Sequence, residues 1–354
     1  MIKNQRIEFI DVLKGFAIFL VVWGHSIQNC SPTIRFFDNP VFAGIYSFHM
    51  PIFFLVSGFF FSSSLKLGAK DFLVKKFVQL ILPCIVWQIF YYAMFYVEAY
   101  TTHDQTFLDA GLAHLWGIIN PYCFQMWFLR DLFVSYVLAY FALKLLKKYH
   151  IAAVLSILIV CIAPFLTEFQ RFLFPFFWVG ILLSNKQQIF FKHVKTITIV
   201  VGMLWAVSLL FWNGHYTIYE TDFQKLFDIR HLNFDFTNIG IITFRFFIGL
   251  FGSMFWFGIF AIIYRKNSLY NVLGKVGKRT LAIYLLSNYM FRFCIESIID
   301  FSSFNQWIYT LILTPLFAII LTAVCMLIIA AVQKNSKLDL FFFGNKRKKI
   351  TPTL

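Results

Sequence analysis

Apolar runs long enough to cross a lipid bilayer recur along almost the whole of this 354-residue sequence. The hydrocarbon core of a bilayer is spanned by a helix of about 20 apolar residues. Composition agrees with repeated crossing, because 60% of the residues are hydrophobic and only 13% are charged, unlike a soluble domain. We read the runs as about ten transmembrane helices, over residues 9–28, 41–63, 77–99, 127–146, 149–166, 169–184, 195–212, 239–264, 279–299 and 306–332. The sequence therefore predicts an all-α integral membrane protein with a single polytopic domain over residues 1–354.

The positions of Lys and Arg predict which side of the membrane each connection faces. Cytoplasmic connections carry an excess of these residues. Every second connection here is basic, with Lys3 and Arg6; Lys66, Lys70, Lys75 and Lys76; Lys144, Lys147 and Lys148; Lys186, Lys192 and Lys195; Arg265, Lys266, Lys275, Lys278 and Arg279; and, in the tail, Lys334, Lys337, Lys346, Arg347, Lys348 and Lys349. We therefore expect an even number of spans, with both termini and a basic tail over residues 333–354 in the cytoplasm.

The strong positive charge of the chain needs no partner beyond the membrane itself. The net charge is +15, and the basic residues lie where membrane topology places them. We expect the lipid bilayer as a partner and no nucleic acid. The six cysteines lie mostly within the predicted spans and form no C-x-x-C pair, so we expect no bound metal.

Three ionisable residues share one face of the first predicted span. Lys14 and His25 are eleven positions apart, which on an α-helix is three turns plus roughly 20° and a rise of about 16 Å. Asp11 lies within roughly 40° of the same face. Ionisable groups inside a membrane are costly and mark functional sites by default, and histidine transfers protons near neutral pH. We interpret His25, Lys14 and Asp11 as candidate catalytic residues.

A structural role explains each of these residues about as well when it is taken alone. Asp11 and Lys14 are three residues apart, so they can pair near the inner interface while Lys14 extends toward the headgroups. His25 can simply end the outer part of the helix. The presence of all three on one face is what favours a functional site.

The second and fourth spans supply candidate substrate-binding residues. His49 precedes Pro51, which predicts a kink, and His49 can face His25 because the two spans are antiparallel and joined by a short loop. Ser57 is a further candidate, although tight helix packing explains Ser57 and Gly58 better.

The fourth span begins with Trp127, which is placed like a residue of the interfacial aromatic belt. Arg130 and Asp131 follow just inside the membrane. Adjacent helical residues point apart, so we do not expect these two to pair with each other alone. Trp127 and Arg130 are candidate substrate-binding residues. Arg245 and Arg292 are further intramembrane cations that need partners, and together these groups predict a polar cavity.

Two basic segments are candidates for binding an anion in the cytoplasm. Lys75 and Lys76 precede the third span, where a nucleotide or coenzyme A suits their charge; cytoplasmic retention explains them equally well. The segment LGKVGKRTLAIYLLS, residues 273–287, lacks the glycine spacing of a P-loop. Its cations fit an anion site, but a helix start with positive flanks explains them better.

Several segments together resemble the membrane-bound acyltransferase family 3, within it the branch of fucose 4-O-acetylase-like O-acetyltransferases. The matching segments are FIDVLKGFAIFLVVWGHS, SFHMPIFFLVSGFFF, the region of Lys75 and Lys76, WFLRDLFVSY and GKRTLAIYLL. The resemblance implies that His25 is the catalytic histidine and that Lys14 helps to position the acyl donor or tunes the site. It departs at two points: Gln79 stands where the family often has the second Arg of an Arg-x-x-Arg pattern, and Ser287 stands where many members have a His.

The resemblance implies an enzyme of the bacterial cytoplasmic (inner) membrane. It would move an acyl group, commonly acetyl, from cytoplasmic acyl-CoA to a hydroxyl of an extracytoplasmic glycan or lipid-linked sugar. His25 would be the general base or the acyl carrier, and acetyl-CoA would be a donor substrate rather than a permanently bound cofactor. A transporter or flippase that exports a glycan precursor or glycolipid is the alternative. A non-catalytic scaffold is disfavoured because it gives the charged stripe no task.

Overall fold

The structure, a computed structural model, describes residues 8–31, 35–116, 126–163, 166–217, 227–228, 233–265, 267–295 and 298–345. The basic run that begins at Lys346, together with Lys3 and Arg6, lies outside the described residues. The helices are α1 Glu8–Asn29, α2 Pro40–Tyr46, α3 His49–Phe59, α4 Ala69–Lys76, α5 Leu82–Thr102, α6 Gln105–Trp116, α7 Trp127–Leu146, α8 Tyr149–Ile162, α9 Glu168–Asn185, α10 Gln187–Lys192, α11 Val194–Leu210, α12 Phe236–Ile263, α13 Ser268–Gly277, α14 Thr280–Met290, α15 Gln306–Ile308, α16 Thr314–Val332 and α17 Ser336–Phe343.

Shorter elements complete the helical bundle. Three π-helical segments continue or precede longer helices, at Phe77–Ile81, Phe291–Ile295 and Tyr309–Leu313. Short 3-10 helices lie at Phe36–Asp38, Phe61–Lys66 and Gly214–Tyr216. One antiparallel pair of two-residue strands, β1 Phe227–Asp228 and β2 Asn233–Phe234, precedes α12. Within the described residues, every predicted span consists mostly of helix, which confirms the helical prediction. Residues 164–165 and 296–297, near the ends of two predicted spans, lie outside the described residues.

Five helical stretches of the described residues are long and apolar enough to cross a membrane by length and composition. These stretches are Glu8–Asn29, Pro40–Lys66, Ala69–Thr102, Phe236–Ile263 and Gln306–Val332. Shorter apolar helices accompany them at Tyr149–Ile162, Val194–Leu210 and Thr280–Ile295. The chain is thus a helical protein built for more than one crossing. The count of ten spans and the cytoplasmic position of both termini stay predictions.

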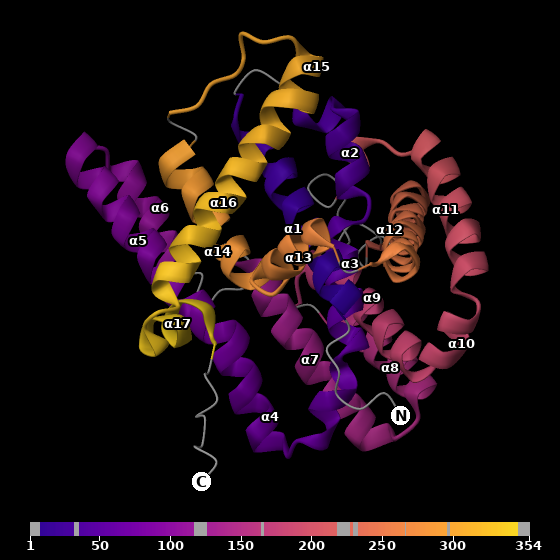
Figure 1. Cartoon of the computed structure of the whole chain (residues 1–354). Helices are drawn as coiled ribbons and strands as arrows, with labels where there is room; N and C mark the ends of the chain where they lie inside the picture. Colours follow the sequence, from indigo (N-terminus) through magenta and orange to yellow (C-terminus); the bar gives the residue numbers. More distant parts are fainter. Residues whose placement is uncertain are drawn as a thin grey trace.

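Helix α1 is the centre of the bundle, as Figure 1 shows. It packs against α13, α16, α12, α14 and α3. Most of its residues are buried, including apolar side chains on every side of the helix, the pattern of a helix enclosed by protein. α5 and α6 lie at one edge of the bundle and α10 and α11 at another. The helix that carries the candidate catalytic stripe is therefore surrounded by other helices.

Glycines allow two very close contacts between helices. A Cβ atom at Gly15 would overlap the carbonyl of Leu273, and one at Gly277 would overlap the carbonyl of Asp11, so α13 crosses α1 at the end that carries Asp11. A Cβ atom at Gly58 would likewise overlap a carbonyl of α9. The predicted role of Gly58 in close helix packing is confirmed.

The second predicted span is interrupted just before Pro51, which confirms the kink predicted there. α2 ends at Tyr46, and α3 begins at His49. Pro51 explains the break. In an unbroken helix the proline ring would clash with the carbonyl of Ser47, four residues earlier, and would remove that carbonyl's hydrogen bond. With the break in place, Pro51 occupies the first turn of α3, where a missing N–H is tolerated.

Candidate functional site

The acid and the cation of the α1 stripe form an ion pair. Lys14 Nζ lies 3.2 Å from Asp11 Oδ1. The carboxylate is nearly buried, with 8% of its side chain exposed, whereas 24% of the Lys14 side chain is exposed. The pairing expected from the three-residue spacing is confirmed. It leaves the ammonium partly accessible at the end of α1 that α13 crosses.

His25 lies near the opposite end of α1 and packs against protein. Its ring centroid is 5.9 Å from that of Phe291, in the π-helical segment that follows α14. Its Nδ1 is 3.2 Å from Gln28 Oε1. An amide oxygen only accepts hydrogen bonds, so in this arrangement Nδ1 carries the hydrogen and Nε2 of the neutral ring keeps its lone pair. This tautomer leaves Nε2 able to accept a proton.

His49 begins α3 and is held in the same tautomer. Its Nδ1 donates to the carbonyl oxygen of Ile45 at 2.9 Å, and its ring lies 4.4 Å from that of Tyr46. Only 4% of His49 is exposed. His49 and His25 lie on helices that pack against each other, α3 and α1. That the two rings face each other stays a prediction.

Arg130 and Asp131 pair with each other, which corrects the sequence prediction in part. Arg130 Nε donates to Asp131 Oδ1 at 2.7 Å, because the long arginine side chain folds back along α7. Thr167 joins them: its hydroxyl accepts from Arg130 at 3.2 Å and donates to Asp131 Oδ2 at 3.1 Å. Asp131 is 1% exposed, and a buried carboxylate needs such partners. Arg130 is therefore tied to α9 through Thr167.

The other intramembrane cations also lie against protein groups. The guanidinium of Arg245 lies over the ring of Phe172, 4.0 Å from its centroid. Arg292 lies 3.6 Å from a carboxylate oxygen of Glu98. The expectation that such cations pair with acids, carbonyls or a ligand is confirmed for Arg292, whose partner is Glu98.

Two predicted substrate-binding residues, Trp127 and Ser57, form packing contacts with neighbouring helices. Trp127 stacks on Phe169 of α9, with ring centroids 4.0 Å apart. The carbonyl oxygen of Ser57 accepts a hydrogen bond of 3.2 Å from the hydroxyl of Tyr136. The structure thus places Trp127 at the α7–α9 contact and Ser57 beside a residue that lines the cavity described next. Their binding roles stay predictions.

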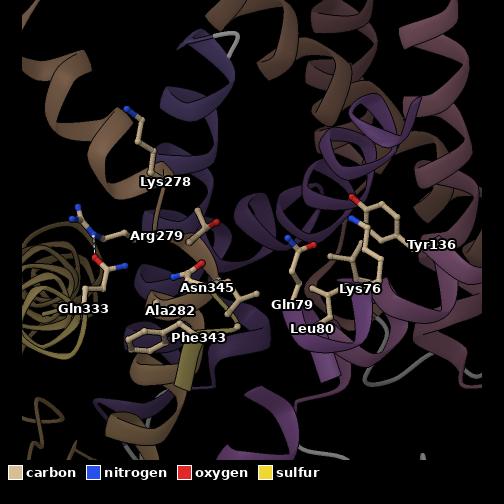
Figure 2. Close-up of a pocket in the computed structure, with 14 residues that line it drawn as sticks. Lys76, Gln79, Leu80, Tyr136, Lys278, Arg279, Ala282, Gln333, Phe343 and Asn345 are labelled. Carbon is tan, nitrogen blue, oxygen red and sulfur yellow. Dashed lines mark hydrogen bonds between the residues drawn. The ribbon is translucent and has the colours of Figure 1, made fainter. Parts of the chain in front are cut away.

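A cavity of about 240 Å³ lies where five parts of the chain meet. Figure 2 shows residues that line it. Its polar lining consists of Lys76, Gln79, Tyr136, Lys278, Arg279, Thr280, Gln333 and Asn345, and its other lining residues are Leu80, Leu132, Leu281, Ala282, Phe343 and Gly344. Three lining residues are cations and none is an acid. We call this space the basic cavity.

The two lysines predicted to bind an anion are separated by the structure. Lys76 lines the basic cavity, and its Nζ lies 3.4 Å from the centroid of the Tyr136 ring. Lys75 is exposed and is not among the lining residues. Gln79, where the family resemblance expects an arginine, lines the same cavity. This departure from the family pattern therefore falls within the candidate anion site.

The remaining cations of the basic cavity come from the junction of α13 and α14. Arg279 Nε donates to Gln333 Oε1 at 3.2 Å, which ties this junction to the end of α16 (Figure 2). Thr280, the first residue of α14, also lines the cavity. The N-terminus of a helix carries partial positive charge. The cavity thus combines three side-chain cations with a helix N-terminus, a combination suited to phosphate.

Sequence reasoning found only part of this cavity. The sequence favours a helix start with positive flanks around Lys278 and Arg279, and the structure shows that start at Thr280, with all three residues lining the basic cavity. Gln333 and Asn345 carried no signal, because they come from distant parts of the chain. The excess of Lys and Arg in these connections indicated a possible anion site. Nothing in the sequence indicated that Lys76, and not Lys75, would line the cavity.

Comparisons with known proteins point to one family. A family model described as an acyltransferase domain matches residues 7–332. Nodulation protein NolL of Sinorhizobium fredii is 28% identical over 220 residues, which cover 59% of this chain and 57% of that protein. Nodulation protein NolL of Mesorhizobium japonicum is 27% identical over 192 residues, 51% of this chain and 49% of that protein. The chain thus spans about half the length of these relatives. No solved structure matches it.

The family match covers nearly the whole bundle, from α1 to the end of α16. It includes His25, His49 and most of the residues that line the basic cavity. It confirms the resemblance predicted from the sequence motifs. Together with the apolar helices, it also supports a multi-pass membrane protein. The chain belongs to the acyltransferase family.

Proposed function

We propose that this protein is a membrane O-acyltransferase that uses cytoplasmic acyl-CoA, with acetyl as the expected acyl group. The acceptor is a hydroxyl of an extracytoplasmic glycan or lipid-linked sugar. One arrangement supports the proposal: the basic cavity adjoins the end of α1 that carries Asp11 and Lys14, and His25 lies near the other end of the same helix.

The donor end is supported by charge and packing. A phosphate-bearing donor suits the cations Lys76, Lys278 and Arg279, whose charges no lining acid offsets. Gly277, one residue before Lys278, packs on the backbone of Asp11. The basic cavity therefore adjoins the end of α1 that carries the Asp11–Lys14 pair, and Lys14 is a candidate to position the donor.

The distance between the two ends suits an extended thioester arm. His25 is eleven residues beyond Lys14, a rise of about 16 Å along the helix axis. The phosphates of CoA would bind in the basic cavity while its pantetheine arm extends toward His25. The bilayer is thereby crossed by the donor's arm rather than by its charged nucleotide, which would be costly to desolvate.

The chemistry at His25 follows from its tautomer. With Nδ1 hydrogen-bonded to Gln28, Nε2 accepts the proton of the acceptor hydroxyl as its oxygen attacks the thioester carbonyl. The C–S bond then breaks, and the proton passes to the thiolate of CoA. In the second route, Nε2 first takes the acyl group, releasing CoA, and the sugar hydroxyl then displaces the imidazole. His49 is a candidate to bind the acceptor.

The location is part of the proposal. The cations of the basic cavity, Lys76, Lys278 and Arg279, belong to connections with an excess of Lys and Arg, which the positive-inside rule assigns to the cytoplasm. Ten spans with both termini in the cytoplasm, in the inner membrane of a bacterium, fit this assignment. The histidines then lie toward the outer surface, where a glycan acceptor is found.

Activity of the purified protein tests the proposal. With acetyl-CoA and total membrane glycolipid as acceptor, the wild type is expected to release CoA thiol and acetylate the acceptor, and His25→Ala is expected to lose both. His150→Ala, which removes an exposed histidine at the start of α8, is the matched control and retains activity. A transporter would show no acyl transfer in any variant. Full activity of His25→Ala at wild-type protein levels would refute the assigned role.

A further inference from the structure

One face of α5 carries a buried amide without a hydrogen-bond partner. The buried residues of this face include Cys84, Gln88 and Tyr91, which recur at the spacing of a single helical face. Gln88 is 0% exposed. Neither its Nε2 nor its Oε1 forms a hydrogen bond to any residue that the structure describes. A buried amide is costly to leave unpaired, so a ligand that forms hydrogen bonds with Gln88 would remove this cost.

The face that carries Gln88 begins at the basic cavity. Leu80 lines that cavity, and the thiol of Cys84, one turn further, donates to the carbonyl of Leu80 at 3.0 Å. Cys84 lies close enough to Arg130 and Asp131 of α7 for both charges to act on its thiol. Gln88 is one turn beyond Cys84, so it lies about 12 Å along the helix from Leu80.

Helices α7 and α14 also extend from the basic cavity into the bundle, and both carry aromatic residues at about the depth of Gln88. On α7, Phe128 is eight residues from Tyr136, which lines the cavity, and this again is a rise of about 12 Å. Phe128 contacts Tyr284 of α14, with ring centroids 5.4 Å apart. Tyr284 in turn is three residues beyond Leu281, another lining residue. Three helices therefore extend together from the basic cavity into the bundle.

The same direction leads to the catalytic histidine. On α14, Asn288 lies one turn beyond Tyr284 and accepts a hydrogen bond of 3.0 Å from the hydroxyl of Tyr91, which ties α14 to the face of α5 that carries Gln88. Phe291, three residues further, contacts the ring of His25. Gln88 therefore lies at an intermediate depth, beyond the basic cavity and before His25.

From this position we infer that Gln88 binds an amide of the pantetheine arm of the acyl-CoA donor. The inference rests on the proposed function, because that arm is the part of CoA which reaches from the phosphates to the thioester. Pantetheine carries two secondary amides, each with one N–H and one C=O group. A glutamine side chain offers the complementary acceptor and donor together. Gln88 is thus assigned as a residue that binds the acyl-CoA donor between the basic cavity and His25.

Binding measurements on the purified full chain separate this role from that of the basic cavity. The probes are CoA and 3′-phosphoadenosine 5′-diphosphate, the nucleotide part of CoA without pantetheine. Gln88→Leu is expected to weaken CoA binding about tenfold, or about 1.4 kcal/mol, and to leave nucleotide binding unchanged. Thr198→Val is the matched control, since it removes a buried hydroxyl from α11 and should leave both affinities unchanged.

Each outcome bears on a different statement. If Gln88→Leu binds CoA as the wild type does, Gln88 does not contact pantetheine. If Gln88→Leu and the longer, flexible Gln88→Met both lose CoA and nucleotide equally, Gln88 acts on the fold and the inference is also wrong. If the wild type binds neither probe, the acyl-CoA donor itself is wrong, and the proposed function fails before Gln88 is considered.

Discussion

Gly277 lies so close to the carbonyl of Asp11 that no side chain fits between α13 and α1. Through this contact the junction of α13 and α14, which supplies Lys278 and Arg279 to the basic cavity, is held against the end of α1 that carries Asp11 and Lys14. The contact therefore links the proposed donor site to the Asp11–Lys14 pair.

This contact predicts a large effect of a single methyl group. Gly277→Ala must separate two backbones, and overpacking of this kind costs about 1–3 kcal/mol. We expect a lower melting temperature in detergent and weaker CoA binding, measured by thermal unfolding and by a binding isotherm. Gly240→Ala in α12 is the control, because a Cβ atom there meets nothing within 4 Å. Equal melting temperatures for the two variants would contradict the close packing.

Charge in the basic cavity predicts donor affinity. A hydrogen bond to a charged group contributes about 1.5–3 kcal/mol, so Arg279→Gln is expected to raise KM for acetyl-CoA by about tenfold or more with a smaller change in kcat. Lys75→Gln is the control, since Lys75 is exposed and outside the cavity lining. Steady-state kinetics at low and moderate salt measure both variants. A larger effect of Lys75→Gln would move the donor site away from the cavity.

The Arg130–Asp131–Thr167 group predicts a non-additive effect on stability. Asp131→Asn leaves Arg130 without its carboxylate partner, and breaking a buried ion pair in this way costs about 3–5 kcal/mol. Replacing both residues, as Arg130→Met with Asp131→Asn, removes the uncompensated charge and should recover part of that loss. Unfolding of the wild type, of the single variants Asp131→Asn and Arg130→Met and of the double variant gives the coupling energy. Simple addition of the two single effects would show that the ions do not depend on each other.

Cysteine labelling tests the proposed orientation. In intact cells, a membrane-impermeant maleimide should label Asp38→Cys, on the exposed 3-10 helix between α1 and α2, and should label Ser63→Cys, on the exposed connection before α4, only after permeabilisation. The wild type with its own cysteines measures the background. Labelling of Ser63→Cys in intact cells would invert the orientation and place the basic cavity outside.

Local pattern alone was enough to predict most helices. The predicted span over residues 127–146 has the bounds of α7, and the span over residues 149–166 covers α8. Apolar runs bounded by polar residues determine such helices, because each backbone group in a membrane must be hydrogen-bonded within its own segment. The kink predicted from Pro51 is found one turn earlier, between α2 and α3, because the proline ring would clash with the carbonyl four residues before it.

The sequence also determined which residues form the stripe on α1, because helical spacing determines which residues share a face. The sequence therefore determined that Lys14 and His25 lie on one side of one helix, about three turns apart. It also identified Asp11 as the partner of Lys14.

Tertiary structure alone decided what surrounds that face. Lys76, Arg279, Gln333 and Asn345 form one cavity although they come from α4, the start of α14, the end of α16 and the end of α17. No local rule relates positions so far apart. The pairing of Arg130 with its neighbour depends on Thr167 in the same way. Helix identity is a property of each segment, whereas a binding site depends on which segments pack together.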